Sequence, residues 1–142
     1  GGEVPKGHIH PGSNEEFRVV SGELEIVLDG ESKRIGPGET AYVKAGQAHM
    51  FRNPSTDETR VQVTIDPAGQ MPRALLEVHG FLDGRAGGPV DELLQLLRFA
   101  DAYDVYLGGL PVWVQKIGLW CLVPTARLLG YGRSFVEKKQ GP

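Results

Sequence analysis

The fold class and the chemistry of this chain are decided by one stretch, HIHPGSNEEF, at residues 8–17. Successive side chains of a strand alternate between its two sides, so His8 and His10 should face the same way. Pro, Gly, Ser and Asn follow them and are typical of tight turns. The pattern therefore predicts two strands joined by a turn, with both imidazoles on one side.

The strand after the turn carries two adjacent glutamates with different predicted positions. Glu15 alternates with Phe17 and Val19 and should face the core with them, while Glu16 should face water. Two glutamates on opposite faces do not form a general acid/base pair. Because a buried, unpaired carboxylate is costly and a cation compensates its charge, Glu15 is expected to lie beside a cation.

A third histidine, His49, lies far along the chain and should share a face with Phe51. Imidazole binds first-row transition metals well, and a carboxylate adds an anionic oxygen. We therefore predict one divalent transition metal (Fe, Mn, Ni, Zn or Cu) bound by His8, His10, Glu15 and His49. The alternatives are ordinary hydrogen-bonded core histidines, or a barrel that keeps the ligands and holds no metal. Three of the four histidines of the chain fall into this set, which favours the metal.

Residues 1–66 have the pattern of short strands and tight turns. Leu24, Ile26 and Leu28 alternate with other residues, and the Asp29-Gly30 pair after them is the strongest short signal for a hairpin. Short strands with turns at this spacing are typical of a β-sandwich or a small barrel. Residues 1–66 are therefore predicted to form a mainly β domain.

After Pro67 the periodicity becomes that of helices. Apolar residues at helical spacing follow Asp91, a predicted N-cap, and Pro111 should open a last helix that Pro124 kinks or breaks. Residues 67–142 are therefore predicted to form a helical C-terminal extension. Its apolar content exceeds what a free appendage tolerates, so we expect it to pack on the barrel or at the interface of a homodimer.

Composition excludes several classes of protein. The chain has 142 residues and a net charge of −3, with no basic run that would indicate a nucleic-acid partner. The single Cys121 excludes an intrachain disulfide framework and fits a reducing compartment. No signal peptide is visible, and Lys116 and Arg127 interrupt the apolar residues 110–129, so no membrane span is expected. We predict a cytoplasmic protein with a small-molecule partner.

The spacing of these residues resembles the two sequence motifs of the cupin superfamily. Gly2-x5-His8-x-His10-x4-Glu15-x6-Gly22 matches the first motif at every defined position. Gly38-x5-Lys44-x-Gly46-x2-His49-x3-Asn53 matches the second, except that Lys44 replaces the usual proline. The resemblance implies a jelly-roll β-barrel in which His8, His10, Glu15 and His49 bind metal. It also implies that the glycines and Asn53 are turn and strand-end residues.

Two features depart from the cupin pattern. Lys44 lacks the fixed φ of proline, so the loop ahead of His49 is expected to be looser without losing a ligand. Cupin barrels normally have strands ahead of the first motif, so we expect this one to lack N-terminal strands or to be completed by another chain, and we expect residues to precede Gly1. The extension resembles, more faintly, that of some single-domain bacterial cupins, in part through the segment LGGLP at residues 107–111.

Two functions of different classes fit the predicted site. The first is an enzyme, because the resemblance implies dioxygenases, isomerases, decarboxylases and lyases with this ligand set. An oxygenase would use Fe(II), with a substrate oxygen and O2 at the two remaining positions. Glu15 is the predicted catalytic residue, leaving the metal during turnover to carry a proton. The second is a non-catalytic small-molecule-binding or sensing module, and fold alone does not choose between the two.

Five other side chains have simpler interpretations. Trp113 and Trp120 are seven residues apart and share a helix face, which favours core or subunit-interface packing. His79 is expected to be a structural residue of a short helix over 73–82. Gln62 and Thr64 alternate with apolar residues on a late strand, and their pattern allows either face.

Overall fold

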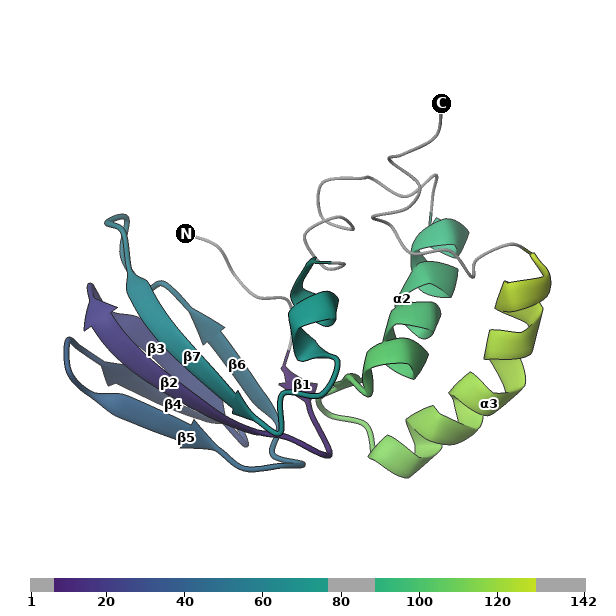
Figure 1. Cartoon of the computed structure of the whole chain (residues 1–142), viewed down its shortest axis with the longest axis horizontal. Coiled ribbons are helices and arrows are strands. Elements are labelled where there is room, and N and C mark those ends of the chain that lie inside the picture. Colours follow the sequence, from purple (N-terminus) through teal and green to yellow (C-terminus); the bar gives the residue numbers. More distant parts are fainter. Residues whose placement is uncertain (1–6, 77–88, 130–142) are drawn as a thin grey trace. The chain divides into compact units, whose positions relative to one another are not determined.

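The computed structural model describes residues 7–76 and 89–129 of the chain (Figure 1). The elements in chain order are β1 (His8–Ile9), β2 (Asn14–Ser21), β3 (Leu24–Leu28), β4 (Glu31–Ile35), β5 (Thr40–Val43), β6 (His49–Arg52), β7 (Arg60–Asp66), α2 (Pro89–Tyr103), β8 (Tyr106–Leu107) and α3 (Val112–Leu128). Residues 71–76 are also helical. The rest of the short helix predicted over 73–82, with His79, lies outside the described residues.

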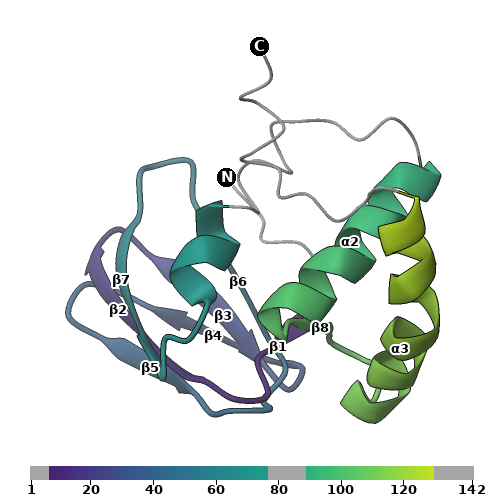
Figure 2. The same cartoon turned by 45° about the vertical axis from the view of Figure 1, so that its right-hand side comes forward.

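The strands form two antiparallel sheets, and the predicted mainly β, jelly-roll fold is confirmed. One sheet has the strand order β4-β3-β6-β1-β8 and the other the order β5-β2-β7 (Figure 2). Side chains of both sheets form one buried apolar cluster of Phe17, Val19, Leu24, Ile26, Ile35, Ala41 and Val43. Burying these side chains between two layers is what stabilises the arrangement.

The predicted hairpin at Asp29-Gly30 is confirmed and sets the register of two strands. Both turn residues have positive φ, 49° at Asp29 and 90° at Gly30. This combination is typical of the two-residue turn whose twist suits antiparallel strands. As a result β3 and β4 pair directly next to the turn, with Leu28 opposite Glu31.

Alternation along β2 places the carboxylate as predicted. Glu15, Phe17 and Val19 are 5%, 1% and 1% exposed, whereas Glu16 is only partly buried.

Gln62 and Thr64 lie on the neighbouring strand β7, and the sequence did not decide whether their side chains face the core or the solvent. Both are exposed, so neither lies at the buried site.

The chain divides into two compact units, and the first of them is not continuous in sequence. The first unit contains β1 to β7 and also Tyr106–Pro111, which includes β8. The second unit contains the helices α2 and α3. The sequence did not predict β8, which lies within the predicted helical extension 67–142, because two residues are too few to show an alternation.

The helices differ from prediction in detail. α2 begins at Pro89, two residues before the predicted N-cap Asp91. α3 continues through Pro124, so of the predicted kink or break at this residue the break does not occur. One face of α3 carries its buried residues, Leu119, Val123 and Ala126.

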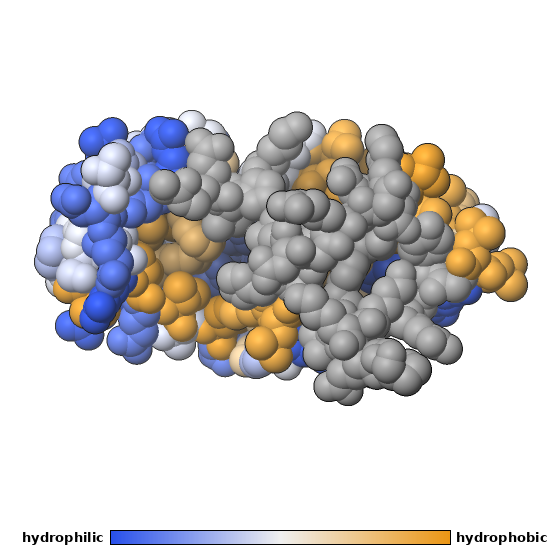
Figure 3. Space-filling view, turned by 90° about the horizontal axis from the view of Figure 1, so that it is seen from above, coloured by the Kyte–Doolittle hydropathy of each residue, from blue (hydrophilic) through white to orange (hydrophobic). Residues whose placement is uncertain are grey.

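Outside these residues α3 carries many exposed apolar side chains (Figure 3). Trp113 and Trp120 are 66% and 81% exposed, so the two tryptophans do not fill a core. Among the residues that the structure describes, no helix is long and apolar enough to cross a membrane.

Candidate metal centre

Three strands bring together the four side chains that the sequence singled out. His8 lies on β1 and is the register partner of His49 on β6, so residues 41 positions apart stand side by side. His10 lies two residues after His8, and the turn at Pro11 and Gly12 returns the chain to β2. Glu15 then follows on the buried face of β2.

The three histidines form a compact cluster. Each offers one ring nitrogen, and these three nitrogens lie within 4.8 Å of one another. The ring centroids of His8 and His49 are 4.2 Å apart, and those of His8 and His10 are 4.8 Å apart. His10 and His49 are buried and His8 is partly buried, so the cluster is largely removed from water.

Glu15 contacts two of these histidines with its two oxygens. Its Oε1 lies 3.3 Å from Nε2 of His10, and its Oε2 lies 3.2 Å from Nε2 of His49. Ligand atoms at neighbouring positions around a metal with bonds of about 2.1 Å are separated by about 3.0–3.4 Å. The two measured contacts have this length.

The hydrogen bond of His49 to its own loop determines which nitrogen faces the cluster. Nδ1 of His49 lies 3.1 Å from the carbonyl oxygen of Gln47, which can only accept, so Nδ1 carries the hydrogen and donates it. In the neutral ring Nε2 is then an acceptor. It is buried, has no hydrogen-bond partner of acceptable geometry and faces the Glu15 carboxylate, a second acceptor.

Two acceptors that face one another in a buried place need a cation between them. Burying a carboxylate and lone pairs without compensation is unfavourable, and a proton or a metal ion provides the compensation. Metal-bound histidines commonly donate their other N–H to a carbonyl, as His49 does. The residues present therefore fit a divalent metal ion.

The electrostatics of the cluster favour the metal-binding form of His8. Burial, followed by the neighbouring His49 and His10, lowers the pKa of His8 from 6.5 to about 3, although Glu15 opposes the shift. His8 is therefore neutral near pH 7, as a metal ligand must be. Burial raises the pKa of Glu15, but the contact with His49, and after it the electrostatic interaction with the neighbouring histidines, outweighs burial and lowers it. Glu15 is therefore ionised.

Aromatic side chains lie directly beside the cluster. The Phe17 ring is 6.2 Å from the His49 ring and 4.9 Å from the Phe51 ring. Phe17 is fully buried in the apolar core, and Phe51 packs against that core. Phe17 therefore both fills the core and borders the site, whereas Phe51 packs against Phe17 and the core.

The loop ahead of His49 is held by hydrogen bonds that the sequence did not reveal. Lys44 donates its backbone N–H to Oε1 of Gln47 at 3.1 Å, a bond that the usual proline could not make. Nε2 of Gln47 donates to Asp29 at 2.8 Å, and the N–H of Gly46 donates to the carbonyl of His10 at 2.9 Å. Lys44 was predicted to loosen this loop, and its hydrogen bond to Gln47 compensates for the missing proline.

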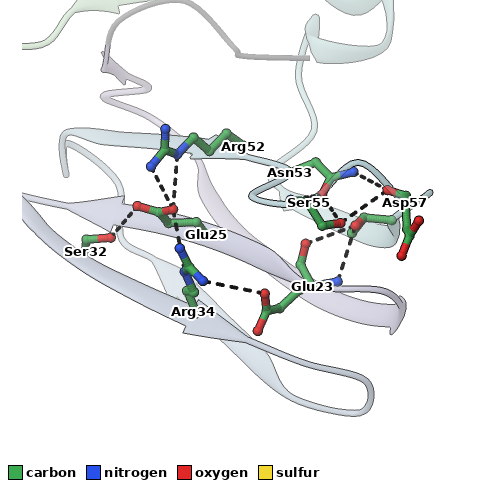
Figure 4. Close-up of polar contacts among 9 residues, drawn as sticks. Glu23, Glu25, Ser32, Arg34, Arg52, Asn53, Ser55 and Asp57 are labelled. Atoms are coloured by element: carbon green, nitrogen blue, oxygen red, sulfur yellow. Dashed lines mark hydrogen bonds and ion pairs between the residues drawn. The ribbon is translucent and has the colours of Figure 1, made fainter. Parts of the chain in front are cut away.

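A charged network on β3, β4 and β6 was also missed. Glu25 is 8% exposed and accepts hydrogen bonds from Ser32 at 2.9 Å and from Nε and a terminal nitrogen of Arg52 at 3.1 and 2.9 Å (Figure 4). Nε of Arg34 lies 3.8 Å from the same carboxylate. The network bonds β6, three residues beyond His49, to β3. Opposite charges at facing positions of two strands predict such a network, but only when the register that places them opposite one another is known.

Asn53 is a turn residue, as the motif implies. Its side chain donates to the carbonyl of Asp57 at 2.6 Å and accepts from the N–H of Ser55 at 3.0 Å (Figure 4). These bonds close the loop that follows β6.

Two antiparallel sheets around an inward cluster of three imidazoles and a carboxylate define a jelly-roll protein with an internal polar site. The family described as "Cupin domain" matches residues 1–66. Residues 1–66 are therefore a cupin domain.

Curated relatives extend the comparison beyond the β domain. "Probable oxidoreductase patJ" of Aspergillus clavatus is 35% identical over 153 aligned residues, covering 94% of this chain and 46% of that protein. "Polyketide synthase CurC" of Streptomyces cyaneus is 34% identical over 71 residues, covering 50% and 46%. The chain thus spans about half the length of these relatives.

Among solved structures, a sugar phosphate isomerase of the cupin superfamily from Silicibacter pomeroyi is 27% identical. The match covers 46% of this chain and 42% of that one, with a TM-score of 0.41.

Proposed function

We propose that this chain is a metal-dependent cupin enzyme that acts on a small molecule, with oxygenase-type oxidation as the first reaction class and isomerase or lyase chemistry as the second. The observation that carries the proposal is the buried contact of Nε2 of His49 with Oε2 of Glu15 at 3.2 Å, two acceptors that need a cation. The 35% identity to a relative named as an oxidoreductase supports oxidation.

His8, His10, Glu15 and His49 would hold the ion. A bound first-row metal supplies a Lewis acid for substrate oxygen and, where its oxidation state changes, a route for electrons. The ligand types do not select among Fe, Mn, Ni, Zn and Cu.

The side chains of the chain supply orientation and proton transfer. His49 is fixed by its bond to Gln47, which keeps Nε2 directed at the centre. The two oxygens of Glu15 lie within 3.3 Å of Nε2 of His10 and of His49, so a carboxylate oxygen of Glu15 would take up or release a substrate proton beside the centre. Phe17 and Phe51 keep the surroundings apolar, which strengthens every charge interaction there.

The test begins with metal content. Protein purified without nickel affinity should contain one first-row metal per chain, and His49→Ala and Glu15→Gln should lose it. Gln62→Ala on the exposed face of β7 is the matched control and should retain it. Wild-type protein that takes up no Fe, Mn, Ni, Zn or Cu would contradict the proposal.

Activity separates the enzyme from the binding module. The metallated protein should convert an enolic or aromatic diol in air, and His49→Ala should not. A bound ligand that exchanges without forming product would favour the non-catalytic module over the enzyme.

The proposal includes assembly as a homodimer through α3. Trp113, Ile117 and Trp120 are 66%, 57% and 81% exposed and lie three and four residues apart, on one side of the helix. In an antiparallel pair of α3 helices, Trp113 of one copy would meet Trp120 of the partner subunit, so the surface is self-complementary. A monomer measured by light scattering would contradict this part of the proposal.

A further inference from the structure

The strand β1, which carries His8, has little backbone support of its own. It is two residues long, and its only register pair with β6 joins His8 and His49. A strand this short is held by its neighbours and not by its own length. Its other neighbour is therefore important for the position of His8.

That neighbour is β8, about a hundred residues along the chain (Figure 2). Leu107 pairs with His8 and Tyr106 pairs with Ile9. The backbone N–H of Gly108 donates to the carbonyl of Gly7 at 2.5 Å. β8 thus lies along the side of β1 that faces away from β6.

The contact between Gly108 and Gly7 allows no side chain on Gly108. A Cβ atom there would lie 2.6 Å from the Gly7 oxygen and 3.0 Å from the Gly7 carbonyl carbon, both backbone atoms. Gly7 differs, because a Cβ atom on it would meet the His49 oxygen at 3.5 Å, an ordinary contact. The two facing glycines therefore differ in what they tolerate.

We propose that β8, through Gly108, is the positioning element for His8, which rests on the proposed metal centre. A methyl group on Gly108 pushes Gly7 away until the contact exceeds 3.0 Å, a shift of at least about 0.4 Å immediately before His8. Metal–ligand distances tolerate roughly 0.2 Å. The LGGLP segment, which the sequence assigned to the extension, thereby gains a role in the metal centre.

The experiment compares Gly108→Ala with Gly7→Ala in the full chain. Gly108→Ala should weaken Co(II) binding at least tenfold and change the visible spectrum of bound Co(II), while its metal-free circular dichroism stays that of the wild type. Gly7→Ala should bind within a few-fold of the wild type. Equal affinity in all three proteins, or an equal loss in both variants, would overturn the inference.

Hydrogen exchange on the wild type covers the case in which Gly108→Ala does not fold. The amide of Gly108, which donates to Gly7, should become more protected when Co(II) is added, and amides of α3 should not. Unchanged protection at Gly108 would overturn the inference.

NMR spectra of the metal-free protein distinguish a failure of this inference from a failure of the proposed function. If wild-type protein binds no metal, the proposed function fails. The His8 ring signals should still move in metal-free Gly108→Ala by more than in Gly7→Ala, and equal shifts would overturn the role of β8.

Discussion

Acid should destabilise the metal-free protein through His8. The folded protein holds the pKa of His8 at about 3, chiefly by burial, while the unfolded chain restores the ordinary 6.5. Between these values the unfolded state binds a proton that the folded state does not. Stability is therefore fully present above pH 6.5 and is lost progressively as the pH falls toward 3.

The size of the effect follows from the same two values. One pKa unit corresponds to about 1.4 kcal/mol. At pH 5, about 1.5 units below the unfolded value, the free energy of unfolding should be roughly 2 kcal/mol lower than at pH 8. This loss of stability depends little on the pKa of His8 in the folded protein, as long as that pKa lies well below 5.

Urea denaturation at pH 8 and pH 5, with a chelator to keep the protein metal-free, measures this loss. His8→Asn is the matched control, because asparagine keeps a polar side chain and does not titrate. The wild type should lose roughly 2 kcal/mol more than the variant between the two pH values. Glu15 has a lowered pKa, so its contribution falls mostly below pH 4.5 and is shared by both proteins. An equal loss in both proteins would refute the assignment to His8.

Three further perturbations test the supports of the site. Gln47→Ala removes the side chain that ties the loop ahead of His49, and metal affinity should fall roughly 10- to 100-fold in a chelator competition; wild-type affinity would show that the loop holds without it. Arg52→Ala removes two hydrogen bonds from the buried Glu25 and should lower the melting temperature of the metal-free protein, with Arg52→Lys intermediate; an unchanged melting temperature would assign the network no part in stability. Trp120→Ser should convert a dimer to a monomer in light scattering, and a dimer that persists would exclude this side of α3 as the interface.

Local periodicity predicted much of the site. The positions of His8 and His10 two residues apart, and of Glu15 in phase with Phe17, each follow from alternation within one strand. The pairing of His8 with His49 needed the family motif, because a register between strands far apart in sequence leaves no local trace.

The unpredicted parts depend on contacts between distant segments. Glu25 gives no sign of burial until Arg52 and Arg34 stand opposite it. The sequence allowed Gln62 to face either side of its strand, and only the pairing with the exposed Arg18 shows that it faces outward. β8 is too short to carry a pattern, and only its pairing with β1 makes it a strand.

The pairing of β1 with β8 has a consequence for the order of events during synthesis. Residue 8 leaves the ribosome first among the ligands, yet its edge partner follows 99 residues later, at Leu107. Until then the backbone of β1 presents an open edge on that side, and closing so long a loop is slow. We therefore expect the histidine cluster to reach its final geometry late, after the hairpin at Asp29-Gly30 has formed.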